Sequence, residues 1–323
     1  MRAEVSQSAV SRTFTAGASV SDQTRARVLE AANALGYRPN AIARSLISGR
    51  SRMIGLLTAY LENPFYSIFI ERFSRALQAR GYHTLLFISE PGDQDHQLEK
   101  LLAYQVDAVV MASATLSSKL SRECLEAAIP VVLFNRRVPD DSSSSVTSDN
   151  VDGGRQLAEL LCRTGHERIG FITGDENTST SRDRERGFVE ELGAHGRRLH
   201  ARAVADYSAV QARQVTRALM ADHETPDAIF AANDHMAFAV MDTLRHELGL
   251  RVPEDVSVVG FDDVQQAGTA AYDLTSVAQP IDALVAATVE LLFAHLDEPV
   301  VRPRSIVLPV VLRHRSSVHA GRR

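Results

Sequence analysis

Short apolar runs alternate with amphipathic segments along the chain after residue 52. The runs show no clean alternation of apolar and polar residues, which is typical of strands buried on both faces of a parallel sheet. They predict strands at 53–57, 84–88, 106–111, 131–134, 168–173, 228–232, 256–261 and 305–312. Helical periodicity predicts helices at 65–79, 94–104, 154–163, 184–192, 209–221, 236–248 and 281–295.

This order of elements predicts an α/β fold built from right-handed βαβ units. The number of strands is more than one small sheet needs, so we expect two doubly wound parallel-sheet subdomains. The serine-rich stretch 140–145 is predicted to be a loop. In open sheets of this kind ligands bind at the carboxyl ends of the strands, where this sequence places clusters of polar residues.

The first 52 residues have a different pattern, with helical spacing and no apolar strand run. One short helix is expected over 5–12 and a longer one over 22–35. Ser21 is the expected N-cap of the longer helix, and Gly36 is expected to end it. A third short helix is expected to open near residue 39.

Charge is distributed unevenly between these two parts. Residues 1–52 hold eight basic and three acidic residues, a net charge of +5, whereas the whole chain carries −5, so that 53–323 carries −10. A basic end on an acidic body fits a nucleic-acid-binding head joined to a separate body. On charge alone, a solvated arginine-rich helical tail fits equally well.

Other features of the sequence narrow the class of protein. No apolar stretch is long enough to span a bilayer, and the first residues lack the apolar core of a secretory signal. Cys124 and Cys162 lie far apart in apolar helical patterns and are expected to be reduced thiols in a cytoplasmic protein. No phosphate-binding, nucleophile-elbow or zinc-protease motif occurs. We therefore expect no enzyme activity, no metal, no cofactor and no membrane contact.

A long composite motif runs through the basic end. Its parts are Val5-Ser6, Val10-Ser11-Arg12, Thr24-Arg25, Leu35-Gly36-Tyr37-Arg38-Pro39-Asn40 and Ala43-Arg44-Ser45-Leu46. This pattern resembles the headpiece and hinge of LacI/GalR transcriptional regulators. The resemblance implies that the first helix is the recognition helix of a helix-turn-helix and enters the major groove.

The same resemblance implies a set of DNA-binding residues: Ser6, Gln7, Ser8, Ser11, Arg12, Asn40, Arg44 and Leu46. Gln7 and Ser8 would face base edges, and Arg12 would reach a guanine edge or a phosphate. Leu46 would wedge into a minor-groove step, although taken alone it fits an ordinary core leucine on a short helix.

The head departs from the family pattern at its start. A family headpiece begins with a helix of roughly a dozen residues, and here only residues 1–4 precede the turn. The expected head is therefore a small all-α unit that lacks its first helix. Glu4 also stands where the turn usually has glycine. Either the start codon is assigned too far downstream, which we favour, or the gene is truncated, in which case the chain is a sugar-binding protein without DNA binding.

The resemblance continues to the C terminus. Matching motifs include Asn63-Pro64-Phe65-Tyr66, Asn135-Arg136, Arg184-x-x-Gly187-Phe188, Asn233-Asp234 and Pro253-x-Asp255-Val256-Ser257-Val258-Val259-Gly260-Phe261-Asp262-Asp263. They imply an effector domain like a type I periplasmic binding protein. The implied effector-binding residues are Phe65, Tyr66, Asn135, Asp152, Arg184, Asn233 and Asp262.

The residue types implied for the effector site suit a sugar. A guanidinium fork at Arg184 grips two oxygens, and the carboxylate of Asp262 accepts bonds from two hydroxyl groups. Phe65 and Tyr66 would stack on the ring. Asn233 offers a donor and an acceptor, unless it serves only as a helix cap.

Together these observations predict a regulator, more specifically a repressor, that binds operator DNA as a homodimer under the allosteric control of a sugar. The expected domains are a partial helix-turn-helix at 1–38, a hinge helix and linker at 39–52 and an effector domain at 53–323. Within the last, the N-subdomain is expected over about 53–163 and 281–306, and the C-subdomain over about 164–280 and 307–323. The rival classes are a sugar receptor and an enzyme with a doubly wound sheet.

Overall fold

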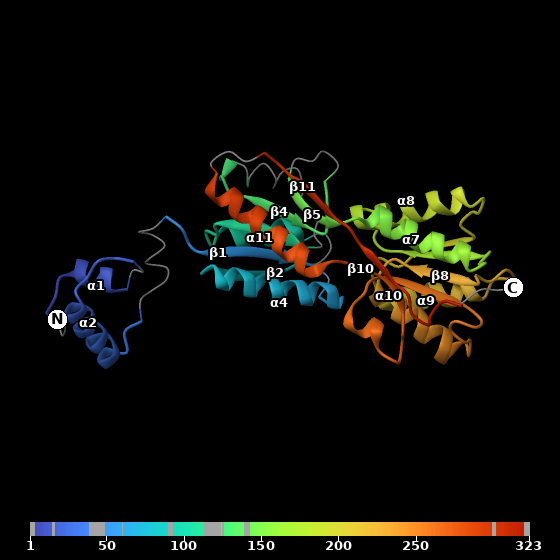
Figure 1. Cartoon of the computed structure of the whole chain (residues 1–323), viewed down its shortest axis with the longest axis horizontal. Coiled ribbons are helices and arrows are strands. Elements are labelled where there is room, and N and C mark those ends of the chain that lie inside the picture. Colours follow the sequence, from blue (N-terminus) through green and yellow to red (C-terminus); the bar gives the residue numbers. More distant parts are fainter. Residues whose placement is uncertain are drawn as a thin grey trace. The chain divides into compact units, whose positions relative to one another are not determined.

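The computed structural model describes residues 4–14, 17–38, 49–59, 61–89, 93–112, 124, 126–138, 143–298 and 302–319. The chain divides into two units, 1–52 and 53–323, and each is described by itself (Figure 1). Three residues of the predicted DNA-binding set, Asn40, Arg44 and Leu46, lie outside the described residues.

The described part of the head contains two helices, α1 (Gln7–Thr13) and α2 (Asp22–Leu35). The side chain of Ser6 accepts a hydrogen bond from the backbone N of Ala9 and caps α1. Ser21 caps α2 in the same way by accepting from the backbone N of Thr24. Gly36 ends α2 in the left-handed conformation, with φ at 61°. The predicted cap at Ser21 and the predicted stop at Gly36 are confirmed.

Helix α1 is too short to be stable alone and depends on its contacts with α2. Thr13, at the end of α1, is buried, and its carbonyl accepts a hydrogen bond from Nη1 of Arg25 at 3.0 Å. The ring centroids of Phe14 and Tyr37 lie 5.8 Å apart and add an apolar contact beyond the ends of both helices. The head is therefore held by a few contacts between two short helices.

The unit 53–323 contains two lobes, each built on a six-stranded sheet (Figure 1). The sheet of the first lobe is parallel throughout, in the order β11-β5-β4-β3-β1-β2. Its strands are β1 (Met53–Thr58), β2 (His83–Ile88), β3 (Ala108–Ala112), β4 (Val131–Phe134), β5 (Ser144–Ser148) and β11 (Ser305–Leu308). Its helices include α4 (Pro64–Ala79), α5 (Gln94–Leu102) and α11 (Ile281–Asp297).

The second lobe has the strand order β12-β10-β9-β8-β6-β7, and only β12 is antiparallel to its neighbour. Its strands are β6 (Ile169–Thr173), β7 (Ala201–Val204), β8 (Ala228–Ala231), β9 (Ser257–Asp262), β10 (Thr275–Ala278) and β12 (Val311–Arg313). Its helices are α7 (Asn150–Arg163), α8 (Ser179–Ala194), α9 (Ala209–Met220) and α10 (Asp234–Asp242), with a π-helical turn (Thr243–Glu247) and a 3-10 turn (Gln265–Gly268). The predicted fold class, two mostly parallel α/β subdomains behind a helical head, is confirmed.

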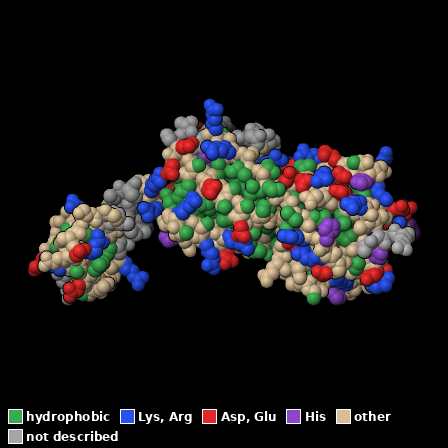
Figure 2. Space-filling model, viewed as in Figure 1, with side chains coloured by type: hydrophobic (Ala, Val, Ile, Leu, Met, Phe, Trp, Pro, Cys, Tyr) green, Lys and Arg blue, Asp and Glu red, His purple; other side chains and the backbone are tan. Residues whose placement is uncertain are grey.

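Each lobe has its own hydrophobic core, because apolar residues cover both faces of each sheet. In the first lobe, Ile54 and Leu56 of β1 face one cluster and Leu57 faces another. The second lobe has one large cluster that contains Phe171, Phe188 and many aliphatic side chains. On the face shown in Figure 2, apolar side chains gather over the first lobe, and charged side chains of both signs cover the second. No helix among the described residues is long and apolar enough to cross a membrane.

Strand β5 begins at Ser144, so the prediction of a loop at 140–145 is wrong for its last two residues, and 140–142 lie outside the described residues. Its sequence is almost entirely hydroxyl-bearing, so apolar periodicity could not reveal it. Two of its buried hydroxyl groups are satisfied inside the lobe: that of Ser144 accepts from the backbone N of Arg304, and the hydroxyl oxygens of Ser145 and Ser305 lie 3.1 Å apart. The short strands β7 and β10 were also not predicted.

The expected boundary between the lobes at residue 163 is wrong, because helix α7 belongs to the second lobe. We expected the first lobe to extend to residue 163, but α7 packs against α8 in the second lobe. Two glycines allow this close approach: a Cβ at Gly154 would lie 2.2 Å from the carbonyl oxygen of Arg184, and one at Gly187 would lie 2.0 Å from that of Val151. The chain therefore passes to the second lobe at 148–150.

The last predicted strand, 305–312, is two strands that belong to different sheets. Strand β11 pairs with β5 in the first lobe, and β12 pairs with β10 in the second. The chain thus crosses between the lobes at 148–150, 278–281 and 308–311, which we call the first, second and third crossovers.

Candidate ligand-binding cleft

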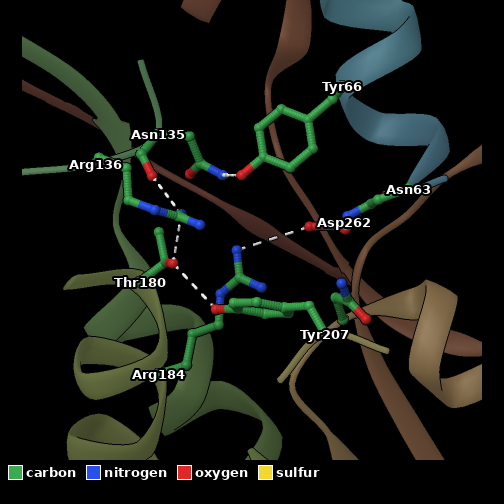
Figure 3. Close-up of a pocket in the computed structure, with 9 residues that line it drawn as sticks. Asn63, Tyr66, Asn135, Arg136, Thr180, Arg184, Tyr207 and Asp262 are labelled. Atoms are coloured by element: carbon green, nitrogen blue, oxygen red, sulfur yellow. Dashed lines mark hydrogen bonds and ion pairs between the residues drawn. The ribbon is translucent and has the colours of Figure 1, made fainter. Parts of the chain in front are cut away.

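A cleft between the two lobes collects polar side chains from the ends of several strands (Figure 3). It encloses about 280 Å³ of empty space, part of it open to solvent. The first lobe contributes Asn63, Tyr66, Asn135 and Arg136, and the second contributes Thr180, Arg184, Tyr207, Asn233 and Asp262. Parallel strands end at the same edge of a sheet, so the residues that follow them meet there, as open α/β sheets require.

Arg184 is the most constrained cation of the cleft. It lies on α8, where the glycine contacts with α7 bring it next to Asn150, and its Nε donates to Asn150 Oδ1 at 2.8 Å. Its Nη1 donates to the carbonyl oxygen of Ala232, and its guanidinium lies 3.7 Å from the centroid of the Phe261 ring. These contacts fix the plane of the fork and direct Nη2 toward Asp262, 3.7 Å away.

Asp262 ends β9 and is held from both lobes. Its Oδ1 accepts from Nε2 of Gln279 at 2.7 Å, and its Oδ2 accepts from Nδ2 of Asn63 at 3.1 Å. Burial raises the pKa of Asp262, and the Arg184 guanidinium opposes that rise. Each carboxylate oxygen can accept more than one hydrogen bond, so a ligand hydroxyl can be added to this set.

Asp234 lies beneath the cleft and does not line it. It is fully buried, its Oδ2 accepts from the backbone N of Val264 at 2.9 Å, and its Oδ1 accepts from the hydroxyl of Ser276. Burial raises the pKa of Asp234 to about 7, and the negative charge of Asp262 contributes to the rise. This carboxyl therefore binds a proton more readily than an ordinary aspartate does.

Asn135 and Tyr66 form the first-lobe wall. Nδ2 of Asn135 donates to the hydroxyl oxygen of Tyr66 at 3.1 Å. Oδ1 of Asn135 is buried and has no hydrogen-bond partner in the described part of the chain. Such an acceptor costs free energy unless a partner arrives, so it marks a position for a donor on a ligand. Burial also raises the pKa of Tyr66, which keeps its hydroxyl neutral.

Arg136 joins the two walls. Its Nη1 donates to the hydroxyl of Thr180 at 2.7 Å and to the backbone carbonyl of Asn135 at 2.8 Å. Thr180 Oγ1 in turn lies 3.1 Å from the hydroxyl of Tyr207. The Arg136 guanidinium lies 5.9 Å from the centroid of the Tyr207 ring. The ring of Tyr207 thus offers an aromatic surface on the second-lobe side.

Asn233 has two functions in the structure. Its Oδ1 accepts from the backbone N of Met236 at 2.9 Å, which caps α10. The residue also lines the cleft, so its side-chain NH2 remains as the donor toward a ligand. The capping alternative and the ligand-binding alternative are therefore compatible.

Five of the seven predicted effector residues line the cleft, and two do not. Phe65 is buried in the first-lobe core, with its ring stacked 6.0 Å from that of Phe134. Asp152 lies in the first turn of α7 and accepts hydrogen bonds from Arg155 and Gln156 instead. Four lining residues were not among those predicted: Asn63, Arg136, Thr180 and Tyr207.

The described residues that line the cleft are suited to binding a ligand. Among the described residues, no group of three or more His, Cys, Asp or Glu side chains could hold a metal ion. The lining instead combines a carboxylate, guanidinium groups, amides and hydroxyls with two aromatic rings. These groups suit a site that recognises a polar, hydroxyl-rich molecule by hydrogen bonds and by contact with an aromatic ring.

The predicted DNA-binding residues of α1 share one exposed face. Gln7, Ser8, Ser11 and Arg12 are exposed, whereas Ala9 and Val10 are half-buried and Thr13 is buried. Ser6 is also exposed, but its hydroxyl caps the helix and lies 2.9 Å from that of Ser8.

Glu4, at the position where the sequence pattern leads us to expect glycine, has φ at +47°. This left-handed conformation is uncommon for a residue with a side chain. The backbone of the turn thus adopts the shape for which glycine is preferred.

The fold and the cleft define a two-lobed small-molecule-binding protein that carries a helical head. Residues 1–40 match the family described as "Bacterial regulatory proteins, lacI family", and residues 158–318 match a "Periplasmic binding protein-like domain". The chain belongs to the LacI family of bacterial regulatory proteins, as the composite motif of the head predicted. It is thus a transcriptional regulator and not an enzyme.

Two relatives illustrate this membership. The HTH-type transcriptional regulator CelR of Thermobifida fusca is 34% identical over 325 residues, which cover 98% of this chain and 95% of CelR. The ribose operon repressor of Escherichia coli K12 is 29% identical over 321 residues, which cover 98% of this chain and 97% of that repressor. The likeness therefore extends over both the head and the lobes.

Solved structures agree with the fold. A Lac repressor dimer bound to operator and the anti-inducer ONPF has a TM-score of 0.87 at 26% identity and covers 98% of this chain and 96% of that one. A CelR–cellobiose complex has a TM-score of 0.76 at 32% identity and covers 98% of this chain and 97% of that one.

Proposed function

We propose that this protein is a repressor whose affinity for operator DNA is set by a sugar bound in the cleft between its lobes. The observation that carries the proposal is the cleft itself. A carboxylate, a fixed guanidinium fork and an unpartnered amide oxygen face one small space between two tyrosine rings. Vicinal hydroxyl groups on a ring match these partners, and the C–H surface of a sugar matches the tyrosine rings.

The site residues that we propose are those that line the cleft. Arg184 and Asp262 would hold hydroxyl groups from the second-lobe side, and Asn233 would donate from its side-chain NH2. Asn135 would accept from a hydroxyl group on the first-lobe side. The related CelR has been solved with cellobiose, which supports a sugar as the class of effector.

The proposed mechanism couples two equilibria. A homodimer presents two heads to a pseudo-palindromic operator, with Gln7 and Ser8 at base edges and Arg12 at a base edge or phosphate. Ser6, Ser11, Asn40, Arg44 and Leu46 complete the proposed contacts, within a head at 1–38 and a hinge and linker at 39–52. The apolar surface of the first lobe supports association between copies.

The sugar biases DNA affinity by binding the two relative orientations of the lobes with different affinity. Release of the operator on sugar binding is the direction we expect, so the sugar is an inducer. The coupling would act in the cytoplasm, where operator DNA is found.

The test is fluorescence anisotropy with the full chain and labelled DNA from upstream of its own gene. A panel that includes cellobiose, D-ribose and D-glucose is added at increasing concentration. We expect binding at low salt and a fall in affinity of about fivefold or more with at least one sugar. Absence of binding to DNA with and without every sugar contradicts the regulator proposal.

The second candidate function is a sugar-binding protein without DNA binding. A thermal-shift screen of the same sugars distinguishes it, because a ligand of the native state raises the melting temperature by mass action. A raised melting temperature together with no DNA binding would favour this candidate. A DNA-binding response to the sugar that raises the melting temperature would exclude it.

A further inference from the structure

The first and second crossovers are bonded to each other by buried side chains. The hydroxyl of Ser148 donates to Oε1 of Gln279 at 2.7 Å, and both residues are buried. The first crossover also contacts the third, because the backbone N of Asp149 donates to the carbonyl oxygen of Leu308 at 2.8 Å. Any rotation of one lobe against the other has to pass through these three segments.

Gln279 extends this contact to the cleft without lining it. Its Nε2 donates to Oδ1 of Asp262 at 2.7 Å, so one amide connects the effector-site carboxylate to Ser148. Asp262 lines the cleft, whereas Gln279 lies behind it. A change in the position of the Asp262 carboxylate must therefore either carry Gln279 along or break a buried hydrogen bond.

A second buried amide connects Arg184 to the same crossover. Oδ1 of Asn150 accepts from Nε of Arg184 at 2.8 Å, and Nδ2 of Asn150 donates to the carbonyl oxygen of Ser148 at 2.9 Å. Both charged groups on the second-lobe wall are thus bonded to Ser148 through one intermediate amide each. The buried polar groups form a closed network in which the loss of one bond leaves others unsatisfied.

We propose that Gln279, together with Ser148, is a positioning residue that sets how far the two lobes close over the effector site. The proposal rests on the proposed function only in that lobe closure is the change the sugar would bias. It assigns no contact with the ligand to either residue. The hydrogen bonds from Asp262 through Gln279 to Ser148 hold the first and second crossovers together. Removing one of these bonds alters the equilibrium between the open and closed arrangements of the lobes.

The test measures the distance between the lobes in the ligand-free protein. Spin labels are placed at the exposed positions Gln78 on α4 and Gln214 on α9, after Cys124 and Cys162 are replaced by alanine. Double electron–electron resonance then gives the distribution of distances between the labels. Ser148→Ala and Gln279→Met each remove one end of the Ser148–Gln279 bond.

Ser145→Ala is the matched control. Ser145 lies in the same strand as Ser148, is equally buried at 1% exposure, and loses a hydroxyl contact with Ser305 that lies within the first lobe. We expect Ser148→Ala and Gln279→Met to broaden the distribution or shift its mean by more than about 2 Å. The control should overlap the unmutated protein.

Overlap of all three variants with the unmutated protein, at unchanged circular dichroism, would overturn the proposal. Ser148→Ala removes a single oxygen atom, so it decides the question even if Gln279→Met does not fold. Equal broadening in Ser145→Ala would also overturn it, because the effect would then be general loosening of the strand. Neither DNA nor sugar enters the measurement, so its outcome is independent of the test of the proposed function.

Discussion

Asn63 of the first lobe donates a hydrogen bond to Asp262 of the second, with 3.1 Å between Nδ2 and Oδ2. The same side chain caps α4, because its Oδ1 accepts from the backbone N of Phe65 at 3.0 Å. One amide therefore both starts a helix and joins the lobes. Because Asp262 also lines the cleft, a ligand that binds its carboxylate acts directly on a contact between the lobes.

The substitution Asn63→Asp separates the two functions of this side chain. An aspartate keeps the cap but places a second carboxylate against Asp262, whose pKa is already raised by burial. The folded protein should then hold an extra proton, so its stability relative to the unmutated protein should fall as pH rises. We expect a loss on the order of 1–3 kcal/mol at pH 8 and a smaller loss at pH 5, measured by urea unfolding.

Ser208→Asp is the control for this comparison. Ser208 caps α9 and accepts from the backbone N of Gln211, and its side chain does not line the cleft, although Tyr207 before it does. Aspartate is as good a cap as serine, so we expect little change at either pH. A loss in Asn63→Asp that does not depend on pH would show that repulsion between the introduced carboxylate and Asp262 is not the cause.

Arg184→Ala should abolish sugar binding while the headpiece keeps its DNA affinity. The fork of Arg184 is fixed by Asn150, by the carbonyl oxygen of Ala232 and by the Phe261 ring. The other guanidinium of the cleft, that of Arg136, is bonded to Thr180 instead. The readout is the melting-temperature shift produced by whichever sugar of the panel stabilises the unmutated protein most. Arg186→Ala is the matched control, because Arg186 lies on the same helix with its side chain 54% exposed. A full sugar-induced shift in Arg184→Ala would remove Arg184 from the site.

Asp234→Asn should change how stability depends on pH. The pKa of Asp234 is raised to about 7, above that of an unfolded aspartate, so the folded state binds the proton more tightly. Stability attributable to this group is therefore full below the pKa of an unfolded aspartate, about 4, and is lost as pH rises from there to about 7. Since one pKa unit corresponds to about 1.4 kcal/mol, the loss can reach the order of 4 kcal/mol.

An asparagine at this position cannot acquire the charge. Urea unfolding should therefore find Asp234→Asn more stable than the unmutated protein at pH 8, with a clearly smaller difference at pH 5. Asp282→Asn, at a side chain that is 84% exposed, is the control and should show no such dependence on pH. An equal difference at both pH values would show that the buried charge of Asp234 is not responsible.

The alternation of apolar runs and helices was enough to predict the two parallel sheets, because strands such as β3 and β8 are apolar throughout. It failed where burial is achieved by hydrogen bonds, as in β5, or where a strand is only half-buried, as in β7. The failure at β7 also hid Tyr207, which stands in the left-handed turn after that strand. Without a predicted strand there was no strand end at which to look for a site residue.

The neighbouring residues Phe65 and Tyr66 show a second limit of prediction from the sequence. Successive helix positions point in directions about 100° apart, and an aromatic pair gives no sign of which ring faces the cleft. In the structure Tyr66 faces the cleft, where its hydroxyl accepts a hydrogen bond from Asn135, and Phe65 stacks in the core. Asn63 is marked in the sequence only as part of a motif, and its hydrogen bond to Asp262 depends on how the two lobes are arranged, which no local pattern encodes.

Gln7 and Ser8 should determine which operator half-site the head prefers. Both are exposed on the same face of α1, and a side chain that pairs with a base edge contributes about 1–3 kcal/mol of discrimination. Gln7→Ala and Ser8→Ala should therefore reduce the preference for the natural half-site about 5- to 150-fold relative to a randomised site, with little change in nonspecific binding. The measurement is anisotropy against a library of half-site variants at fixed salt, because affinity for DNA falls steeply with salt.

Gln23→Ala provides the matched comparison, because Gln23 is an exposed glutamine in the first turn of α2 and outside the proposed contact face. It should leave the ranking of half-sites unchanged. If Gln7→Ala and Ser8→Ala also preserve that ranking, α1 does not read bases through these side chains. The specificity would then have to come from Arg12 or from contacts outside α1, since phosphate contacts alone carry no sequence information.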